Sequence, residues 1–203
     1  MVAEGVEPAL IENAAAQLGF PVGPLQLTDE TSIDLGVKIA KATKAALGAD
    51  YDDAQDAVLF KLFELGRLGR KANAGFYDYD ENGKRQLLWN GLRENWPPAE
   101  QPDFEEVKNR LAMVQTLEAV RALEQGVLMD VREGDVGAIL GWGFMPWSGG
   151  PFSWLDMLGA EKAVETCDAL AAKYGARFAA PALLRDMAQK GSSFYGAAKA
   201  AAA

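Results

Sequence analysis

The side chains that most often act as general bases, nucleophiles and metal ligands are nearly missing from this sequence. Its 203 residues include no histidine and a single cysteine, Cys167. This composition excludes a Ser-His-Asp triad, a Cys-His dyad, an imidazole metal site and a zinc site built from several cysteines. Carboxylates could still act as acids or bases, but no Asp or Glu pair has a spacing that singles it out. We therefore expect neither a metal site nor a complete catalytic centre in this chain.

Two short segments could instead contact a ligand. The first is a Pro- and Gly-rich turn that would present backbone and small side chains; it consists of Phe20, Pro21, Val22, Gly23, Pro24 and Leu25. The second is a basic loop that could hold a phosphate or the carboxylates of a neighbouring domain; it contains Arg67, Arg70 and Lys71. Each has a structural alternative, since such turns commonly join helices in a core and loop cations are commonly solvated.

Composition limits the partners and the compartment. The formal net charge is −9 and the sequence pI is about 4.6, which argues against nucleic-acid binding because that requires a basic surface. Mean hydropathy is −0.09. The sequence contains no stretch of 18 apolar residues, the length that indicates a membrane-spanning helix. No signal peptide opens the chain, so we expect a cytoplasmic protein.

The elements that would position these segments are mostly helical, and we predict an all-α fold. Expected helices run from Pro8 to Gly19, from Thr28 or Asp29 to Leu47, from Asp53 to Leu65 and from Phe104 to about Gln125, with four more after Asp130, Phe152, Glu161 and Pro181. One small β-hairpin is expected near residues 76–89, with Asn82-Gly83 as a two-residue type I′ turn. Three prolines between Trp96 and Pro102 indicate a linker.

The two halves of the chain resemble each other in order and spacing, which indicates a duplicated helical unit. Gly19-Phe20-Pro21 matches Gly143-Phe144-Met145-Pro146, Asp29 matches Asp156, and Gly75-Phe76-Tyr77 matches Ser193-Phe194-Tyr195. We place the first unit at 1–95, the linker at 96–103 and the second unit at 104–203. About twenty helical residues precede Gly126 but only four precede Gly5. We therefore expect the first unit to lack most of its opening helix and the chain to be a fragment; divergence of the first unit is the alternative.

Other notable side chains have structural interpretations. The aromatic run at 141–151 could form a ligand pocket, but we favour burial of Trp142, Phe144 and Trp147 between the two units, because burying one such side chain contributes roughly 1.5–3 kcal/mol. Cys167 is expected to be a small buried residue. Four carboxylates are interpreted as helix caps or helix-face charges: Asp29, Asp34, Asp156 and Asp168.

Two motifs together resemble a known family. Residues 19–29 (Gly-Phe-Pro-Val-Gly-Pro-Leu-Gln-Leu-Thr-Asp) and 67–79 (Arg-Leu-Gly-Arg-Lys-Ala-Asn-Ala-Gly-Phe-Tyr-Asp-Tyr) are similar to segments of the C-terminal domain of 3-hydroxyacyl-CoA dehydrogenases. The run at 141–151 resembles a second copy of that domain. Two tandem copies are typical of the multifunctional α subunit of fatty-acid oxidation complexes. The resemblance covers the chain from about Val2 to Gly196.

The resemblance implies two related helical units of the 6-phosphogluconate dehydrogenase C-terminal-domain type. It also implies a parent enzyme of fatty-acid β-oxidation that oxidises a 3-hydroxyacyl-CoA with NAD, using a His-Glu pair and an NAD-binding domain that this chain lacks. The chain would complete the acyl-CoA cleft with Phe20–Leu25, bind no cofactor itself and be inactive alone. Its partners would be the missing NAD-binding domain, acyl-CoA and a thiolase subunit, and its tandem units would pack as a pseudo-dimer within a monomer. The alternative is a stand-alone, non-catalytic module that binds acyl-CoA or another protein.

Overall fold

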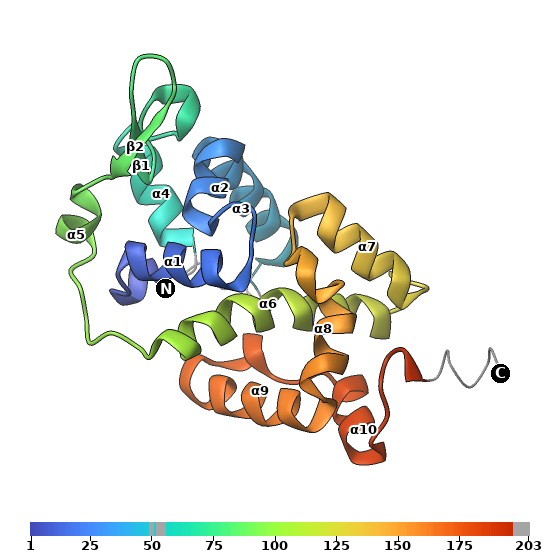
Figure 1. Cartoon of the computed structure of the whole chain (residues 1–203). Helices are drawn as coiled ribbons and strands as arrows, with labels where there is room; N and C mark the ends of the chain where they lie inside the picture. Colours follow the sequence, from blue (N-terminus) through green and yellow to red (C-terminus); the bar gives the residue numbers. More distant parts are fainter. Residues whose placement is uncertain (49–50, 52–55, 197–203) are drawn as a thin grey trace. The chain divides into compact units, whose positions relative to one another are not determined.

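The computed structural model describes residues 1–48, 51 and 56–196, and this part of the chain is mostly helical (Figure 1). Its α-helices are α1 (Pro8–Leu18), α2 (Pro24–Thr31), α3 (Ile33–Leu47), α4 (Ala57–Glu64), α5 (Gly91–Asn95), α6 (Phe104–Glu124), α7 (Val131–Trp142), α8 (Pro151–Leu158), α9 (Ala160–Tyr174) and α10 (Ala182–Lys190). The strands β1 (Tyr77–Tyr79) and β2 (Arg85–Leu88) form one antiparallel pair. Short 3-10 helices are η1 (Val2–Glu4), η4 (Arg70–Ala72), η5 (Pro146–Ser148) and η6 (Ala176–Phe178). The predicted all-α class with one small hairpin is confirmed.

The chain folds as two compact units. Unit 1 comprises Met1–Ala15 and Val22–Phe104, and unit 2 comprises Ala16–Pro21 and Glu105–Ala203. Residues 96–103, the expected linker, contain no helix or strand. They lie against the start of unit 1, where the Ala99 N–H donates to the Gly5 carbonyl (3.0 Å) and the Glu7 N–H donates to the Gln101 side chain (2.8 Å).

Helix ends marked by proline, glycine or a capping carboxylate lie where the sequence predicts them. Helix α1 begins at Pro8 and ends before Gly19, and α6 covers the predicted amphipathic segment. Helix α7 follows Asp130, whose carboxylate accepts from the Arg132 N–H (2.8 Å). These side chains and φ preferences act within one turn of the helix end, so they are readable locally.

The predicted single helix from Thr28 or Asp29 to Leu47 is wrong, because the structure has α2 and α3 in its place. The break lies at Ser32, whose φ of 80° and ψ of 126° reverse the chain. Neither glycine nor proline marks this break, and Ser32, although at the N-cap position of α3, makes no side-chain capping hydrogen bond. The helix predicted to start at Asp53 is α4, which begins at Ala57; Asp53 itself lies outside the described residues.

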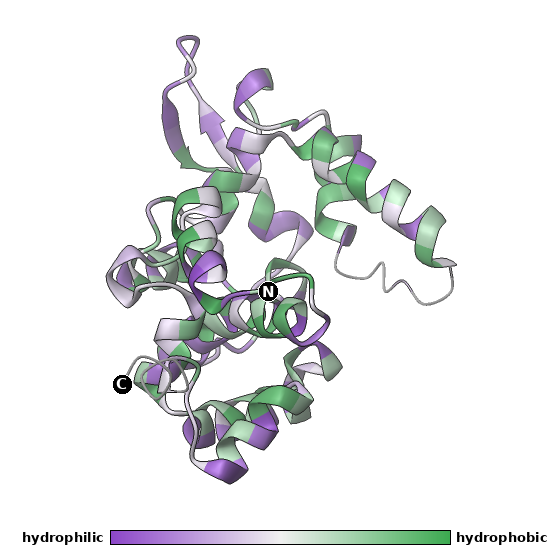
Figure 2. Cartoon of the chain, turned by 90° about the vertical axis from the view of Figure 1, so that its right-hand side faces the viewer, coloured by the Kyte–Doolittle hydropathy of each residue, from purple (hydrophilic) through white to green (hydrophobic). Residues whose placement is uncertain are grey.

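The predicted hairpin is present, but its turn is of another type. Tyr77 pairs with Leu88, and Tyr79 pairs with Arg85 across an irregular register. Of the two expected turn residues only Gly83 has a positive φ (72°), so the turn is not type I′. The Asp80 carboxylate accepts from the Asn82 and Lys84 N–H groups (both 2.9 Å) and holds a longer loop. The hairpin is largely hydrophilic (Figure 2), and Leu87 of β2 is 81% exposed.

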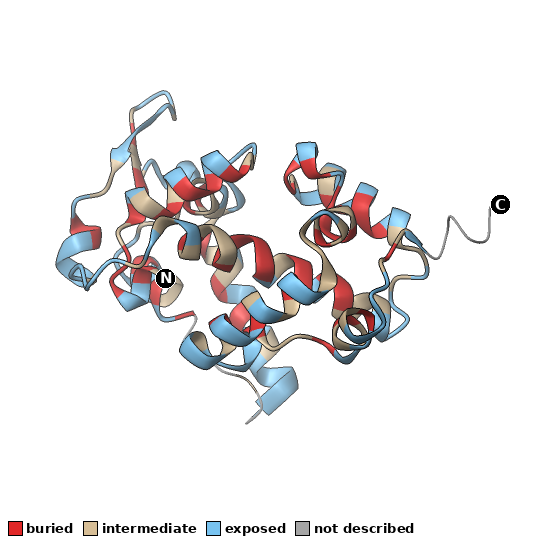
Figure 3. Cartoon of the chain, turned by 60° about the horizontal axis from the view of Figure 1, so that its bottom comes forward, coloured by how far each residue is buried: buried red, intermediate tan, exposed pale blue. Residues whose placement is uncertain are grey.

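Each unit buries its own apolar side chains, which lie on the inward sides of the helices (Figure 3). In unit 2, one core joins α6, α8, α9 and α10, with Phe152 and Phe194 in ring contact at 5.0 Å between centroids. In unit 1, the fully or nearly fully buried side chains include Ile11, Ile33, Leu62 and Leu92.

Replacing Ser32 by Gly should raise the free energy of unfolding by about 1 kcal/mol. A non-glycine residue at positive φ costs roughly 1–3 kcal/mol, and the greater freedom of glycine in the unfolded chain offsets roughly 0.5–1 kcal/mol of that gain. The matched reverse change is Gly159→Ser, because Gly159 precedes α9 with φ 85° and ψ 136° and has open space where a Cβ would lie. It should cost a similar amount. Urea denaturation checks both, and two changes of the same sign would contradict the strain argument.

Candidate functional site

The second half of the predicted ligand turn is held by a carboxylate of α1. The Leu25 N–H donates to Glu12 Oε1 (2.8 Å), and the Tyr77 hydroxyl donates to Glu12 Oε2 (2.7 Å). Gly23, which precedes α2, lies so close that a Cβ there would overlap the Glu12 carboxylate. Val22 remains 36% exposed, whereas Leu25 is buried. The turn is therefore held by partly buried hydrogen bonds, and the Val22 side chain remains partly exposed.

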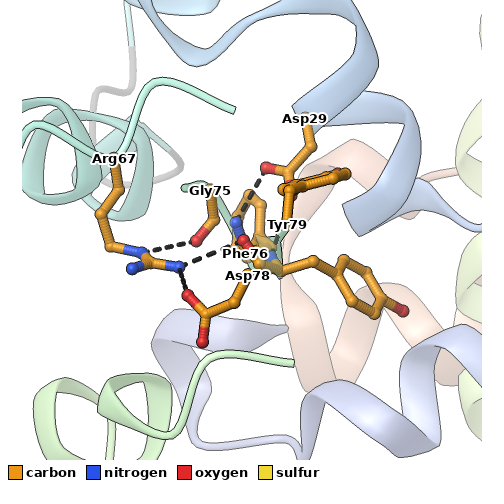
Figure 4. A network of polar contacts seen from close by, with 7 residues as sticks. Asp29, Arg67, Gly75, Phe76, Asp78 and Tyr79 are labelled. Carbon is orange, nitrogen blue, oxygen red and sulfur yellow. Dashed lines mark hydrogen bonds and ion pairs between the residues drawn. The ribbon is translucent and has the colours of Figure 1, made fainter. Parts of the chain in front are cut away.

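Among the described residues of unit 1, Asp29 is the best-buried carboxylate, and it links α2 to the start of the hairpin (Figure 4). It is 1% exposed and accepts from the Phe76 N–H (2.8 Å), the Tyr77 N–H (2.9 Å) and the Tyr79 hydroxyl (3.0 Å). Burial raises its pKa above the ordinary value, although these hydrogen bonds oppose the rise. The interpretation of Asp29 as a cap or surface charge is wrong, because three donors fix it inside the unit.

Unit 2 repeats this arrangement with different residues. Asp135 of α7 accepts from the Phe152 N–H (2.7 Å) and the Tyr195 hydroxyl (2.9 Å), as Glu12 does from Leu25 and Tyr77. Asp156 accepts from the Phe194 N–H (2.7 Å) and the Tyr195 N–H (2.9 Å), as Asp29 does from Phe76 and Tyr77. Asp156 is therefore not a cap either.

Glu12 and Asp135 were not among the residues predicted from sequence. Each is the only acidic residue in the central turns of a helix with apolar and small neighbours. Each also precedes a Gly-Pro pair, Gly23-Pro24 or Gly150-Pro151, by 11 to 15 positions. A Cβ at Gly150 would overlap Asp135, as one at Gly23 would overlap Glu12. This recurring acid and Gly-Pro pair is the signal that could have identified them.

The first half of the predicted ligand turn belongs to unit 2. The Phe20 ring meets the Phe144 ring edge-on, with centroids 5.8 Å apart. The Trp147 indole N–H donates to the Leu18 carbonyl (2.6 Å), and its ring lies beside Gly19. Of the three aromatic residues expected to be buried, only Phe144 is; Trp142 and Trp147 are 53% and 58% exposed. The expectation of burial is therefore wrong for both tryptophans.

The three predicted loop cations all bind acceptors of their own unit. Arg67 donates to the Gly75 carbonyl (2.7 Å) and to the Asp78 carboxylate (2.6 Å; Figure 4). Its guanidinium also lies 4.2 Å from the centre of the Trp89 ring. Arg70 pairs with Glu30 (2.9 Å), and Lys71 pairs with Asp34, whose pKa this contact lowers. These contacts favour a structural role for the loop.

The remaining candidates have structural roles. Cys167 is fully buried as predicted, and burial raises the pKa of its thiol to about 11, so it is not a reactive thiolate. Asp168 pairs with Arg185 across exposed helix faces (2.5 Å), and Asp34 lies in the first turn of α3. Within the described residues, no group of three or more Cys, Asp or Glu side chains could hold a metal ion. No helix in that part of the chain is long and apolar enough to cross a membrane.

Replacing Asp29 by Asn should lower the free energy of unfolding by about 2–3 kcal/mol, because the amide NH₂ would face a backbone N–H and leave it unsatisfied. Asp168→Asn is the matched control, and its exposed ion pair should contribute far less. Guanidinium denaturation of both variants tests this. Equal losses would mean that burial of Asp29 does not matter.

The Asp29 carboxyl should also make stability depend on pH in a defined direction. Its folded-state pKa lies above 3.8 because of burial, so between 3.8 and that higher value the folded state binds more protons than the unfolded state. The wild-type protein should therefore lose stability relative to Asp29→Asn as pH rises through this window. Parallel denaturation of both proteins across the acid range measures the difference, and a gain of stability with rising pH would show a lowered pKa instead.

Comparisons with known proteins show which sequences and folds this chain is similar to. Residues 1–79 match the family model of the 3-hydroxyacyl-CoA dehydrogenase C-terminal domain. A fatty acid oxidation complex subunit alpha of Shewanella amazonensis is 38% identical over 200 residues, covering 96% of this chain and 28% of that protein.

Two solved structures share the fold. The 3-hydroxybutyryl-CoA dehydrogenase of Escherichia coli K12 has a TM-score of 0.66 and 20% identity, over 92% of this chain and 55% of that one. The dehydrogenase part of multifunctional enzyme 1 from C. elegans has a TM-score of 0.62 and 22% identity, over 90% of this chain and 42% of that one. The motifs at 19–29 and 67–79 and the family match lead to one conclusion: residues 1–79 form a C-terminal domain of the 3-hydroxyacyl-CoA dehydrogenase family, and the similarity to the fatty acid oxidation complex subunit alpha continues along both units.

Proposed function

We propose that the chain is the C-terminal helical region of an NAD-dependent 3-hydroxyacyl-CoA dehydrogenase of fatty-acid β-oxidation. The observation that carries this proposal is the similarity to a fatty acid oxidation complex subunit alpha along 96% of the chain, through both units. Because the chain spans 28% of that relative, the activity belongs to a larger protein in this proposal.

The division of labour follows from the residues present. Oxidation of a 3-hydroxyl requires a base for its proton and a nicotinamide for its hydride. With no histidine in 203 residues, the chain leaves the His-Glu pair and the NAD site to another part of the parent. Its own residues would cover the acyl part of the substrate and exclude water, and the chain alone would be inactive.

The turn at Phe20–Leu25 is the part of the chain proposed to contact the acyl group. Glu12 holds its backbone through Leu25, while the apolar Val22 side chain stays partly exposed. A fixed apolar turn suits an acyl chain, because burying each CH₂ group contributes about 0.8 kcal/mol. The cations Arg67, Arg70 and Lys71 could still approach a CoA phosphate, although each already has an acceptor in unit 1.

The first experiment is NADH oxidation with acetoacetyl-CoA by the purified chain, alone and co-expressed with the part of the Shewanella relative that it does not match. We expect no turnover from the chain alone and turnover from the pair. Turnover by the chain alone would show a histidine-free active site and overturn the proposal. Binding of acyl-CoA without any turnover of the pair would favour a non-catalytic module.

In the active pair, Val22→Glu should raise KM for a medium-chain substrate by about tenfold or more with little change in kcat, because a charge would face the acyl chain. Leu87→Glu is the control, since Leu87 is exposed on the hairpin of the same unit. An unchanged KM for Val22→Glu would remove this turn from the acyl site.

A further inference from the structure

One difference between the two units is a loop, and contacts that both units share show where it lies. The Arg67 N–H donates to the Leu62 carbonyl (2.9 Å), and the Ser192 N–H donates to the Met187 carbonyl (3.0 Å), each just after a glycine of positive φ. On the far side of the loop, Phe76 and Phe194 make the equivalent contacts to Asp29 and Asp156. Between these two points unit 1 has residues 68–75, whereas unit 2 has Ser193 alone. We name residues 68–75 the cover loop.

The cover loop closes over the start of α3 in unit 1. The Leu68 carbonyl accepts from the Ile33 N–H (3.2 Å), the first N–H of the helix, and Lys71 pairs with Asp34 in its first turn. Gly69 lies against the Asp29 backbone so closely that a Cβ would overlap it. The loop thereby satisfies a helix terminus, neutralises a carboxylate and buries Asp29.

Unit 2 offers the same surface without its cover. Helix α9 begins after Gly159 with the backbone angles that Ser32 has before α3, so Ala160 and Glu161 take the places of Ile33 and Asp34. Here lies a pocket of about 290 Å³, lined by Asp156, Ala160, Glu161 and Ser193 among others. Within the described residues, the Ala160 N–H has no acceptor and no cation contacts Glu161. Asp156 is only partly buried, in contrast to Asp29.

We propose that this pocket binds a cationic loop of another protein, which takes the place that the cover loop takes in unit 1. A backbone carbonyl of the bound loop accepts from the Ala160 N–H, and a lysine ammonium pairs with Glu161. The occupied surface in unit 1 serves as the template for both contacts. The net charge of −9 favours the approach of a cationic partner.

One difference between the two units indicates which residue type should precede the lysine of the bound loop. In unit 1, Arg70 precedes Lys71 and pairs with Glu30, the residue after Asp29. In unit 2 the residue after Asp156 is Met157, which is 63% exposed. The pocket therefore selects an apolar residue, not an arginine, before the lysine.

The test uses the full chain and a cyclic peptide, Leu-Gly-Leu-Lys-Ala-Asn-Ala, whose sequence follows that of the cover loop. Titration followed by amide chemical shifts should move the Ala160, Glu161 and Ser192 signals. Calorimetry should show about tenfold weaker binding to Glu161→Gln, and Glu165→Gln on the same helix should bind as the wild type does. A peptide with Arg in place of its second Leu should bind more weakly.

Four results would overturn the proposal. Absence of shifts at saturating peptide, or equal binding by Glu161→Gln, would remove the pocket as a peptide site. Binding only after residues 197–203 are deleted would assign the pocket to the chain's own end. A dimer that Glu161→Gln abolishes, measured by sedimentation, would assign it to a second copy.

Discussion

Each unit depends on one carboxylate that accepts hydrogen bonds from two successive backbone N–H groups. Asp29 binds Phe76 and Tyr77, and Asp156 binds Phe194 and Tyr195. The contact ties a short helix to a segment almost forty or fifty residues later, so it closes the unit on itself. The carboxylate is the strong partner here, because charged acceptors form the shorter and stronger hydrogen bonds with N–H donors. A second acid in each unit accepts a hydrogen bond from the hydroxyl of the same tyrosine: Glu12 from Tyr77, and Asp135 from Tyr195. This bond attaches the helix that carries the second acid, α1 or α7.

These shared contacts explain why two positions favour glycine. A residue with a Cβ does not fit at Gly23 or Gly150, because each packs against the acid that holds the following helix. Away from these contacts the two units differ. Unit 1 adds the cover loop and the hairpin, and unit 2 has the long helix α6 over a core of Phe152, Cys167 and Leu184. The two units therefore share these polar contacts, while the apolar residues around them differ.

Much of the helical structure could be predicted from sequence, because its signals are local. Pro8, Gly19, Asp130 and Pro181 mark helix ends through φ preferences or side-chain caps that act within one turn. The break at Ser32 could not be found in this way, because distant contacts hold an ordinary residue at positive φ there. The turn at Asn82-Gly83 was misassigned for a local reason: the side chain of Asp80, two residues before Asn82, sets the length of the turn.

The candidate site shows the same division between local and distant information. Phe20–Leu25 and the loop cations were visible as motifs, yet Glu30 and Asp34, the partners of Arg70 and Lys71, lie 40 and 37 residues away in sequence and emerged only from the fold. The exposure of Trp142 and Trp147 likewise depends on how the helices pack. Composition alone was sufficient to exclude a catalytic or metal-binding imidazole, because the chain contains no histidine.

The single thiol of the chain can be used to measure how often unit 2 opens, separately from unit 1. Cys167 sits at full burial in the centre of the unit 2 core, with the pKa of its thiol raised to about 11. A thiol reagent can therefore react with it only when that core opens. The rate of labelling measures the opening of unit 2 alone, because unit 1 has no cysteine. The sequence therefore already contains a probe that distinguishes the unfolding of unit 2 from that of unit 1.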